Sequence, residues 1–91
     1  MTFHKSQHKK VLTEVYLGKQ LTVVNSSDVS KVGVKGRVLD ETKNLFVIDI
    51  NGKKKKIPKK ECVFELEGYK GFEIDGKDIC YNIADRIKKY A

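Results

Sequence analysis

The sequence lacks the features by which most enzymes and membrane proteins are identified. It has no tryptophan, one proline and one methionine in 91 residues. It contains no glycine-rich phosphate loop, no nucleophile elbow and no His-Glu-x-x-His motif, and its acidic residues are scattered or lie in turns. No apolar run approaches the ~20 residues of a membrane-spanning helix, and the polar start does not resemble a signal peptide. We therefore expect a soluble intracellular chain with no catalytic residues.

Metal-ligating residues are also scarce. Cys62 and Cys80 are the only cysteines, and both are flanked by apolar residues, which favours small core thiols over a redox pair. No histidine lies at ligand spacing to them. His4 and His8 stand four residues apart, but two ligands without a carboxylate are weak support for a metal site. We predict that the chain itself binds no metal and no cofactor.

What the sequence has in excess is lysine, and the lysines are clustered. The net charge is +7, and the segment NGKKKKIPKKE (51–61) holds six lysines between Lys53 and Lys60. Without those six the formal charge is +1, and without the three lysines among the first ten residues as well it is −2. Clustered positive charge indicates a polyanionic partner. The alternative, a thermophile surface, would enrich glutamate together with lysine.

The order of turn signals predicts a mostly β protein. Asn51-Gly52 is a strong hairpin signal, because a type I′ turn needs positive φ at both central residues. The lysine run must then return antiparallel to LFVIDI (45–50), and Pro58 ends that strand or places it at a sheet edge. Helices are expected over 9–18 and, capped by Asn82, over 83–90. Further strands are expected over 20–25, 34–39, 62–66, 71–74 and 77–82.

Short strands with turns every 8–12 residues favour a small antiparallel barrel of six or seven strands, flanked by short N- and C-terminal helices. We expect a flexible basic arm over 1–9 and a single domain over 10–91. Lysine stems on a twisted edge strand can reach one partner while their ammonium groups stay hydrated. Edge lysines also discourage strand-to-strand aggregation, which explains one or two lysines but not six. The pattern favours recognition of duplex-rich RNA by shape and charge.

Three stretches carry a resemblance to a known family. LGKQLTVVNSSDVSKVGVKGRVLDETKNLFVI (17–48), GKKKKIPKKECVFELE (52–67) and DRIKK (85–89) resemble the family of archaeal ribonuclease P protein component 1, to which the eukaryotic RNase P and MRP 29-kilodalton subunit is related. The resemblance covers residues 10–90. Where family members tend to show Arg-Pro-Glu-Asp-Arg, this chain has YNIADR and keeps only Asp85 and Arg86.

The resemblance implies an Sm-like, SH3-type barrel and a place in the RNase P ribonucleoprotein. There the RNA, with Mg²⁺, removes 5′ leaders from precursor tRNA, and the proteins assist in the cytoplasm. It also implies a heterodimer with a zinc-ribbon protein subunit, bound to the specificity domain of the RNA. The piece 32–48 also resembles the KOW element, so a ribosomal or transcription-elongation RNA-binding protein stays an alternative. An SH3-like protein-interaction module is another.

Two sets of candidate site residues follow. The first is basic and is expected to approach RNA phosphate: Lys9, Lys10, Lys35, Arg37, Lys53, Lys54, Lys55, Lys56, Lys59, Lys60, Arg86, Lys88 and Lys89. The second is apolar and is expected either to bind a protein partner or to plug one end of the barrel: Val11, Leu12, Val15 and Tyr16.

Overall fold

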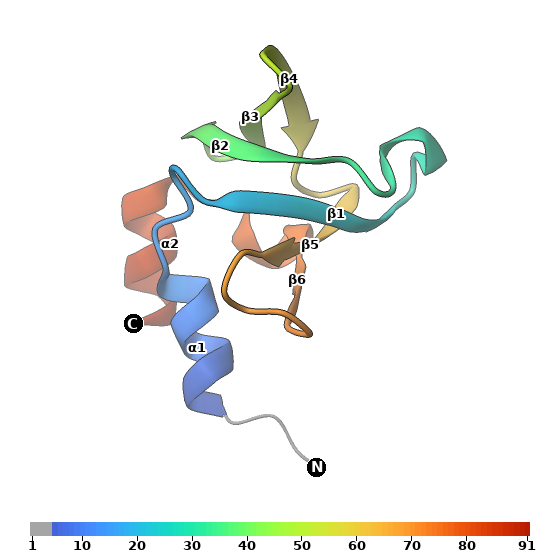
Figure 1. The fold of residues 1–91 in the computed structure, drawn as a ribbon. Helices are drawn as coiled ribbons and strands as arrows, with labels where there is room; N and C mark the ends of the chain where they lie inside the picture. The colour runs from blue at the N-terminus through green and yellow to red at the C-terminus, as the bar shows by residue number, and fades with distance from the viewer. Residues whose placement is uncertain (1–4) are drawn as a thin grey trace.

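The chain folds into one antiparallel sheet with a helix near each end of the sequence (Figure 1). The computed structural model describes residues 5–91. The six strands follow the spatial order β4-β3-β2-β1-β5-β6. This confirms the mostly β fold. In chain order the elements are α1 (Lys5–Thr13), β1 (Gln20–Ser26), the 3-10 helix η1 (Val29–Lys31), β2 (Lys35–Glu41), β3 (Leu45–Ile50), β4 (Lys53–Pro58), β5 (Cys62–Leu66), β6 (Glu73–Asp75), the 3-10 helix η2 (Gly76–Ile79) and α2 (Ile83–Tyr90).

The hairpin of β3 and β4 forms as the Asn-Gly signal predicts. Asn51 has φ of 53° and Gly52 has φ of 87°, the left-handed conformations that the turn requires. The strands pair in register from Leu45 opposite Pro58 to Ile50 opposite Lys53. The lysine run is therefore a strand at the edge of the sheet, and it ends at the proline.

Two predicted elements differ from the structure. The segment predicted as a strand over 77–82 instead contains η2, because Asp75 caps a helical turn by accepting from the Lys77 N–H at 3.0 Å. The first helix lies at 5–13 rather than 9–18. The predicted boundary between arm and domain therefore falls inside α1, and residues 1–4 lie outside the described part.

The core lies inside the curved sheet. Register shifts between Val23 and Asn25, and between Val38 and Asp40, mark the bulges at which the strands bend. Phe46 packs edge-on against Phe64, with ring centroids 5.2 Å apart. These contacts between strands distant in sequence make the sheet barrel-like.

The end of β4 meets η2 at a contact that only glycine permits. A Cβ atom on Gly76 would lie 1.6 Å from the Lys59 carbonyl oxygen. The 3-10 helix can therefore approach the turn after β4 closely. This contact joins segments that follow the two outermost strands of the sheet.

Candidate nucleic-acid interface

The four lysines of β4 divide between two faces of the sheet. Lys54 and Lys56 stand opposite Asp49 and Val47 on β3, on the outer face. Lys53 and Lys55 stand opposite Ile50 and Ile48, on the face that continues into the core. All four side chains are exposed, because the hairpin extends beyond the rest of the sheet (Figure 1).

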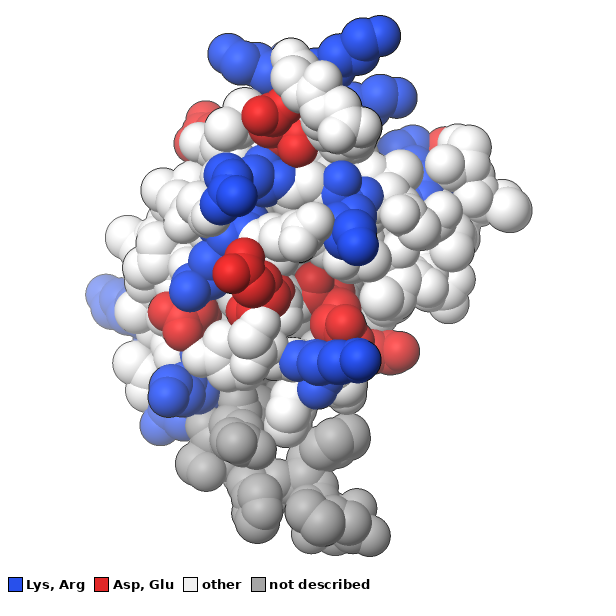
Figure 2. All heavy atoms as spheres, in the orientation of Figure 1, with Lys and Arg blue, Asp and Glu red and all other residues white. Residues whose placement is uncertain are grey.

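Charge on the outer face changes sign across the sheet. One cross-strand row runs Lys54–Asp49–Arg37–Gln20, and its members come from β4, β3, β2 and β1. A second row runs Lys35–Thr22–Glu65–Glu73, from β2 through β1 and β5 to β6. In Figure 2 blue side chains crowd the hairpin end, whereas across the middle of the molecule red and blue side chains are interspersed. The β2–β4 side of this face is therefore the better surface for phosphate.

A polar groove lies within that basic half. It has a volume of about 240 Å³ and lies beside the turn that joins β3 to β4. The Arg37 guanidinium is held at one side, because its Nη1 donates to the Gly18 carbonyl at 2.6 Å. The groove is lined by Gln20, Lys35, Gly36, Arg37, Asp49 and Asn51.

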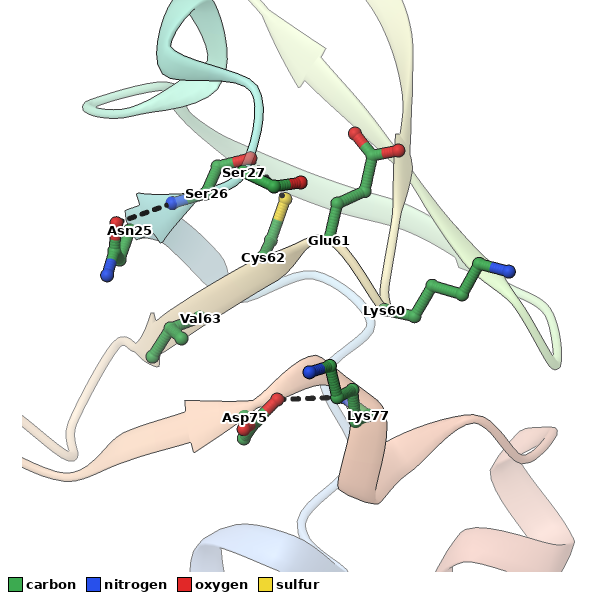
Figure 3. A pocket seen from close by; sticks show the side chains of 9 residues that line it. All are labelled: Asn25, Ser26, Ser27, Lys60, Glu61, Cys62, Val63, Asp75 and Lys77. Atoms are coloured by element: carbon green, nitrogen blue, oxygen red, sulfur yellow. Dashed lines mark hydrogen bonds between the residues drawn. The ribbon is translucent and has the colours of Figure 1, made fainter.

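Lys60 lies apart from the β4 lysines. It follows β4 in the turn before β5 and lines a second, larger groove of about 500 Å³ together with Lys77 of η2 (Figure 3). Glu61 and Asp75 line the same groove, and Glu61 also lies 3.4 Å from the Lys31 ammonium. The charges there are mixed, so this groove attracts phosphate less than the outer face of β2–β4.

The remaining exposed candidates lie on the two helices. Lys9 and Lys10 are on α1, and Lys88 and Lys89 are on α2; all four side chains are exposed. Figure 1 shows both helices at the opposite end of the molecule from the β3–β4 hairpin. The basic candidates thus lie on separate surfaces, and their contact with RNA stays a prediction.

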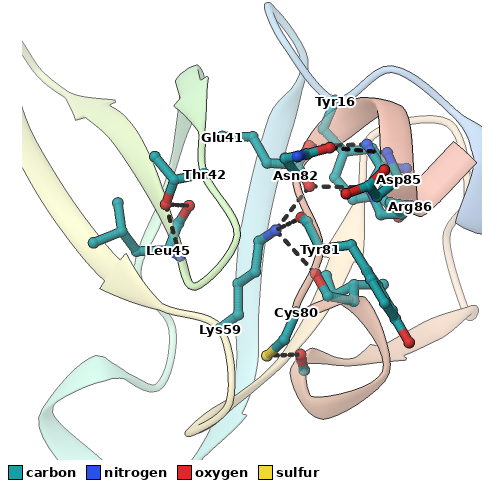
Figure 4. Close-up of polar contacts among 12 residues, drawn as sticks. Tyr16, Glu41, Thr42, Leu45, Lys59, Cys80, Tyr81, Asn82, Asp85 and Arg86 are labelled. Carbon is teal, nitrogen blue, oxygen red and sulfur yellow. Dashed lines mark hydrogen bonds and ion pairs between the residues drawn. The ribbon is translucent and has the colours of Figure 1, made fainter.

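The assignment of Lys59 and Arg86 to phosphate contact was wrong. Both side chains are completely buried, and both pair with Glu41 (Figure 4). The Lys59 ammonium lies 2.9 Å from Glu41 Oε2, and Arg86 grips the same carboxylate with two donors, Nε at 2.9 Å and Nη2 at 2.8 Å. Their charges are therefore not available to an RNA backbone.

This buried cluster joins distant parts of the chain. Lys59 also donates to the carbonyls of Ile79 and Tyr81, each at 2.9 Å. Burial lowers the pKa of Lys59, and the Glu41 carboxylate opposes that shift. The cluster connects the end of β2, the turn after β4 and the segment from the end of η2 to α2.

Arg86 extends the cluster to the N-terminal segment. Its Nη1 donates to the carbonyls of Leu12 at 2.7 Å and Glu14 at 2.8 Å, and its guanidinium lies 3.9 Å from the centre of the Tyr16 ring. Among the described residues no buried side-chain nitrogen or oxygen lacks a hydrogen-bond partner, as a buried charged network requires. Arg86 therefore holds α2 against the last turn of α1 and the residue that follows this helix.

The inward position of Lys59 can be predicted from the alternation of the strand before it. Ile57 points inward, and strand alternation carries Lys59 to the same side. Glu41 gave no such signal, because the bulge between Val38 and Asp40 resets the alternation and turns Glu41 inward. Because the inward position of Glu41 could not be predicted, no feature of the sequence indicated that Lys59 and Arg86 pair with it.

Most of the predicted apolar partner surface lies in the core. Val11 and Tyr16 are fully buried and Leu12 is 8% exposed, whereas Val15 is 45% exposed. The Tyr16 hydroxyl donates to the Val11 carbonyl at 2.8 Å. The alternative in which this segment packs on the barrel therefore holds for these three residues, and only Val15 remains open to a partner.

We expect Tyr16 to reduce stability at alkaline pH. Burial raises the pKa of its phenol above the ordinary value of 10.0, so the folded chain keeps a proton that the unfolded chain loses. Stability contributed by this group is present below pH 10 and declines above it, by about 1.4 kcal/mol at pH 11. Urea unfolding at pH 8 and pH 11 tests this. Tyr16→Phe should cost about 1 kcal/mol at pH 8 through the lost hydrogen bond, but decline less between the two pH values. If the free energy of unfolding fell equally in the natural chain and in Tyr16→Phe between pH 8 and pH 11, the raised pKa of Tyr16 would not be the cause.

The described residues show no metal site of the usual kind. No group of three or more histidine, cysteine or acidic side chains gathers among them. His4 and His8, whose spacing is only weak support for a metal site, lie outside the side chains that the structure describes. Cys62 is a buried free thiol whose pKa is raised by burial, and Cys80 is also free. In the described part of the chain, no helix is long and apolar enough to cross a membrane.

Comparison with known proteins places these features in a family. The model of the family described as "Ribonuclease P/MRP, subunit p29" matches residues 9–89. Ribonuclease P protein component 1 of Pyrococcus furiosus is 36% identical over 83 residues, which cover 89% of this chain and 65% of that relative. The protein of the same name from Methanosphaera stadtmanae is also 36% identical over 83 residues, with 89% of each chain covered.

A solved structure shows the same fold. It bears the description "Structure of Mth11: A homologue of human RNase P protein Rpp29". It matches with a TM-score of 0.58 and 28% sequence identity, over 81% of this chain and 99% of that one.

Proposed function

The chain belongs to the ribonuclease P/MRP p29 family, and we propose that it is an RNA-binding, non-catalytic subunit of ribonuclease P. In this role it assists the RNA component in removing 5′ leaders from precursor tRNA. The RNA carries out the hydrolysis with Mg²⁺, and the chain itself supplies neither a catalytic residue nor a cofactor. The proposed location is the cytoplasm.

The observation that carries the proposal is the basic half of the outer sheet face. Lys54 and Lys56 of β4 share that face with Arg37 and Lys35 of β2. All four side chains are exposed, and they lie on strands of the same sheet. Phosphate contacts of this kind supply affinity and orientation with little reading of sequence, which suits a protein that supports a folded RNA.

The proposed partners are the specificity domain of the RNase P RNA, precursor tRNA indirectly, and a zinc-ribbon protein subunit in a heterodimer. Exposed apolar side chains near the start of β1 support a protein contact. Val15, Leu17 and Leu39 are 45%, 40% and 42% exposed. The Gly18 N–H donates to the Val38 carbonyl at 2.9 Å, which brings the segment of Leu17 beside that of Leu39.

Two other functions are less well supported, because the family match favours a ribonuclease P subunit. A KOW-type ribosomal or elongation protein would bind RNA without affecting precursor tRNA cleavage. An SH3-like peptide-binding module needs an exposed aromatic cluster, whereas Tyr16, Phe46 and Phe64 are fully buried.

Reconstitution tests the proposal directly. The chain is added to RNase P RNA with the other protein subunits, and cleavage of precursor tRNA is followed at low Mg²⁺. At low Mg²⁺ few metal ions screen the repulsion between the RNase P RNA and precursor tRNA. We expect cleavage to depend on the chain under these conditions, because its bound lysine and arginine side chains reduce that repulsion. The matched control is the same mixture without the chain. Cleavage that is unchanged by the chain, or cleavage by the purified chain without RNA, would contradict the proposal.

A further inference from the structure

A carboxylate stands within the basic half of the outer face. Asp49 is the register partner of Arg37 on one side and of Lys54 on the other. Within the described part of the chain Asp49 forms no ion pair, since Arg37 donates instead to the Gly18 carbonyl. The negative charge of Asp49 weakens phosphate binding at this position. Another function of this carboxylate, in ligand binding, would explain its presence.

Asp49 has one structural role, which uses only part of the hydrogen-bond accepting capacity of its carboxylate. Its Oδ1 accepts from the Gly52 N–H at 2.8 Å, which closes the hairpin turn. A carboxylate has about four acceptor positions. The side chain is only partly buried and lines the groove of about 240 Å³, so its remaining acceptor positions are open to a ligand.

Two amides complete the groove. Gln20 precedes Leu21 at the start of β1, and Asn51 lies in the hairpin turn; both line the groove and both are exposed. Among the described residues, neither side-chain amide makes a hydrogen bond. Each can therefore both donate to and accept from a ligand.

The groove is smaller than the roughly 300–1,000 Å³ of most small-molecule sites. Its basic side chains, Lys35 and Arg37, suit a phosphate, and its amides and carboxylate suit the edge of one base. Gly36 also lines the groove, where β2 and β3 approach so closely that a Cβ atom would lie 2.5 Å from the Asp49 carbonyl oxygen.

We infer that this groove binds a single unpaired nucleotide of the RNA and selects a base that carries an exocyclic amino group. Asp49 accepts from that amino group, the Gln20 and Asn51 amides contact the rest of the base edge, and Lys35 and Arg37 hold the adjoining phosphate. Guanine, adenine and cytosine carry such a group and uracil does not. Unpaired bases in bulges and loops are the usual targets of sequence reading in RNA. The inference rests on the proposed RNA-binding function and adds one position of base preference to it.

The test uses four RNA hairpins that differ only in one bulged nucleotide, which is G, A, C or U. Binding to the purified chain is measured over a range of salt concentrations. We expect the hairpin with bulged U to bind roughly tenfold more weakly than the others. The salt slope should be the same for all four, because the phosphate contacts do not change.

Asp49→Asn separates base reading from turn formation. Its amide oxygen can still accept from the Gly52 N–H, its negative charge is gone, and its NH₂ group can donate to the uracil carbonyl. We expect this variant to bind the U hairpin more tightly than the natural chain does, and to discriminate less than about twofold. The matched control is Glu73→Gln, which removes one negative charge from the other half of the same face and should leave the preference intact. Gln20→Ala should reduce the preference without changing the salt slope.

The outcomes are distinguishable. Equal binding of the four hairpins by the natural chain, or an Asp49→Asn variant that strengthens all four alike, would overturn the base-reading groove and leave the proposed RNA-binding function intact. Absence of salt-dependent binding to any hairpin would overturn both.

Discussion

Glu41→Gln should lower the free energy of unfolding by about 3–5 kcal/mol, the largest stability effect that we expect from a single substitution. The substitution leaves Lys59 and Arg86 buried with no counter-charge, and it points an amide donor at groups that are themselves donors. Urea unfolding at neutral pH measures the change. The cluster also holds α2 against the N-terminal segment. Limited proteolysis at neutral pH should therefore cut α2 faster in this variant than in the natural chain.

Two comparisons identify the cause. Glu73→Gln removes an exposed carboxylate and should change stability by less than about 0.5 kcal/mol. Lys59→Met removes one of the two cations, so adding it to Glu41→Gln should restore part of the lost stability rather than add a further loss. A Glu41→Gln variant as stable as Glu73→Gln, or losses that simply add in the double variant, would contradict the buried network.

Replacement of both Lys54 and Lys56 with glutamine should weaken RNA binding far more than replacement of both Lys53 and Lys55. The two pairs lie on the same strand and carry the same charge, but only Lys54 and Lys56 share the outer face with Arg37. If each of the two contacts one phosphate, the slope of log affinity against log salt falls by about 1.4–1.8 for the outer pair. The inner pair serves as the matched control. Titrations of the reconstituted RNA at several salt concentrations give the slopes.

The same experiment can locate the interface elsewhere. Equal losses from both pairs would indicate that the whole hairpin tip, rather than the outer face, meets the RNA. Unchanged slopes for both pairs would remove β4 from the interface. The exposed candidates outside β4 would then remain: Lys35 and Arg37 on β2, Lys60, and Lys9, Lys10, Lys88 and Lys89 on the helices. Either result would overturn the assignment of Lys54 and Lys56 to phosphate contact on the outer face.

Much of the local structure could be predicted from short stretches of sequence. The Asn51-Gly52 turn, the end of β4 at Pro58 and the capping of α2 by Asn82 were each predicted correctly. In the last of these, Asn82 Oδ1 accepts from the Asp85 N–H at 2.9 Å. These features depend on the conformational preferences and hydrogen bonds of adjacent residues, so the sequence contains the necessary information. The helical turn of η2 was missed because Asp75-Gly76 is compatible with either a hairpin or a cap.

The sequence by itself determined that the chain is a small basic β protein with a lysine strand bound to its most apolar strand. Only the tertiary structure decided which charges reach the surface. Two bulges, at Val23–Asn25 and Val38–Asp40, change which side chains point inward, and the second turns Glu41 into the core. Lys59 and Arg86, two cations from distant segments, are buried with that carboxylate and form ion pairs with it. A buried charge is stable only beside its counter-charge, and the meeting of three residues separated by up to 45 positions is decided by the fold as a whole.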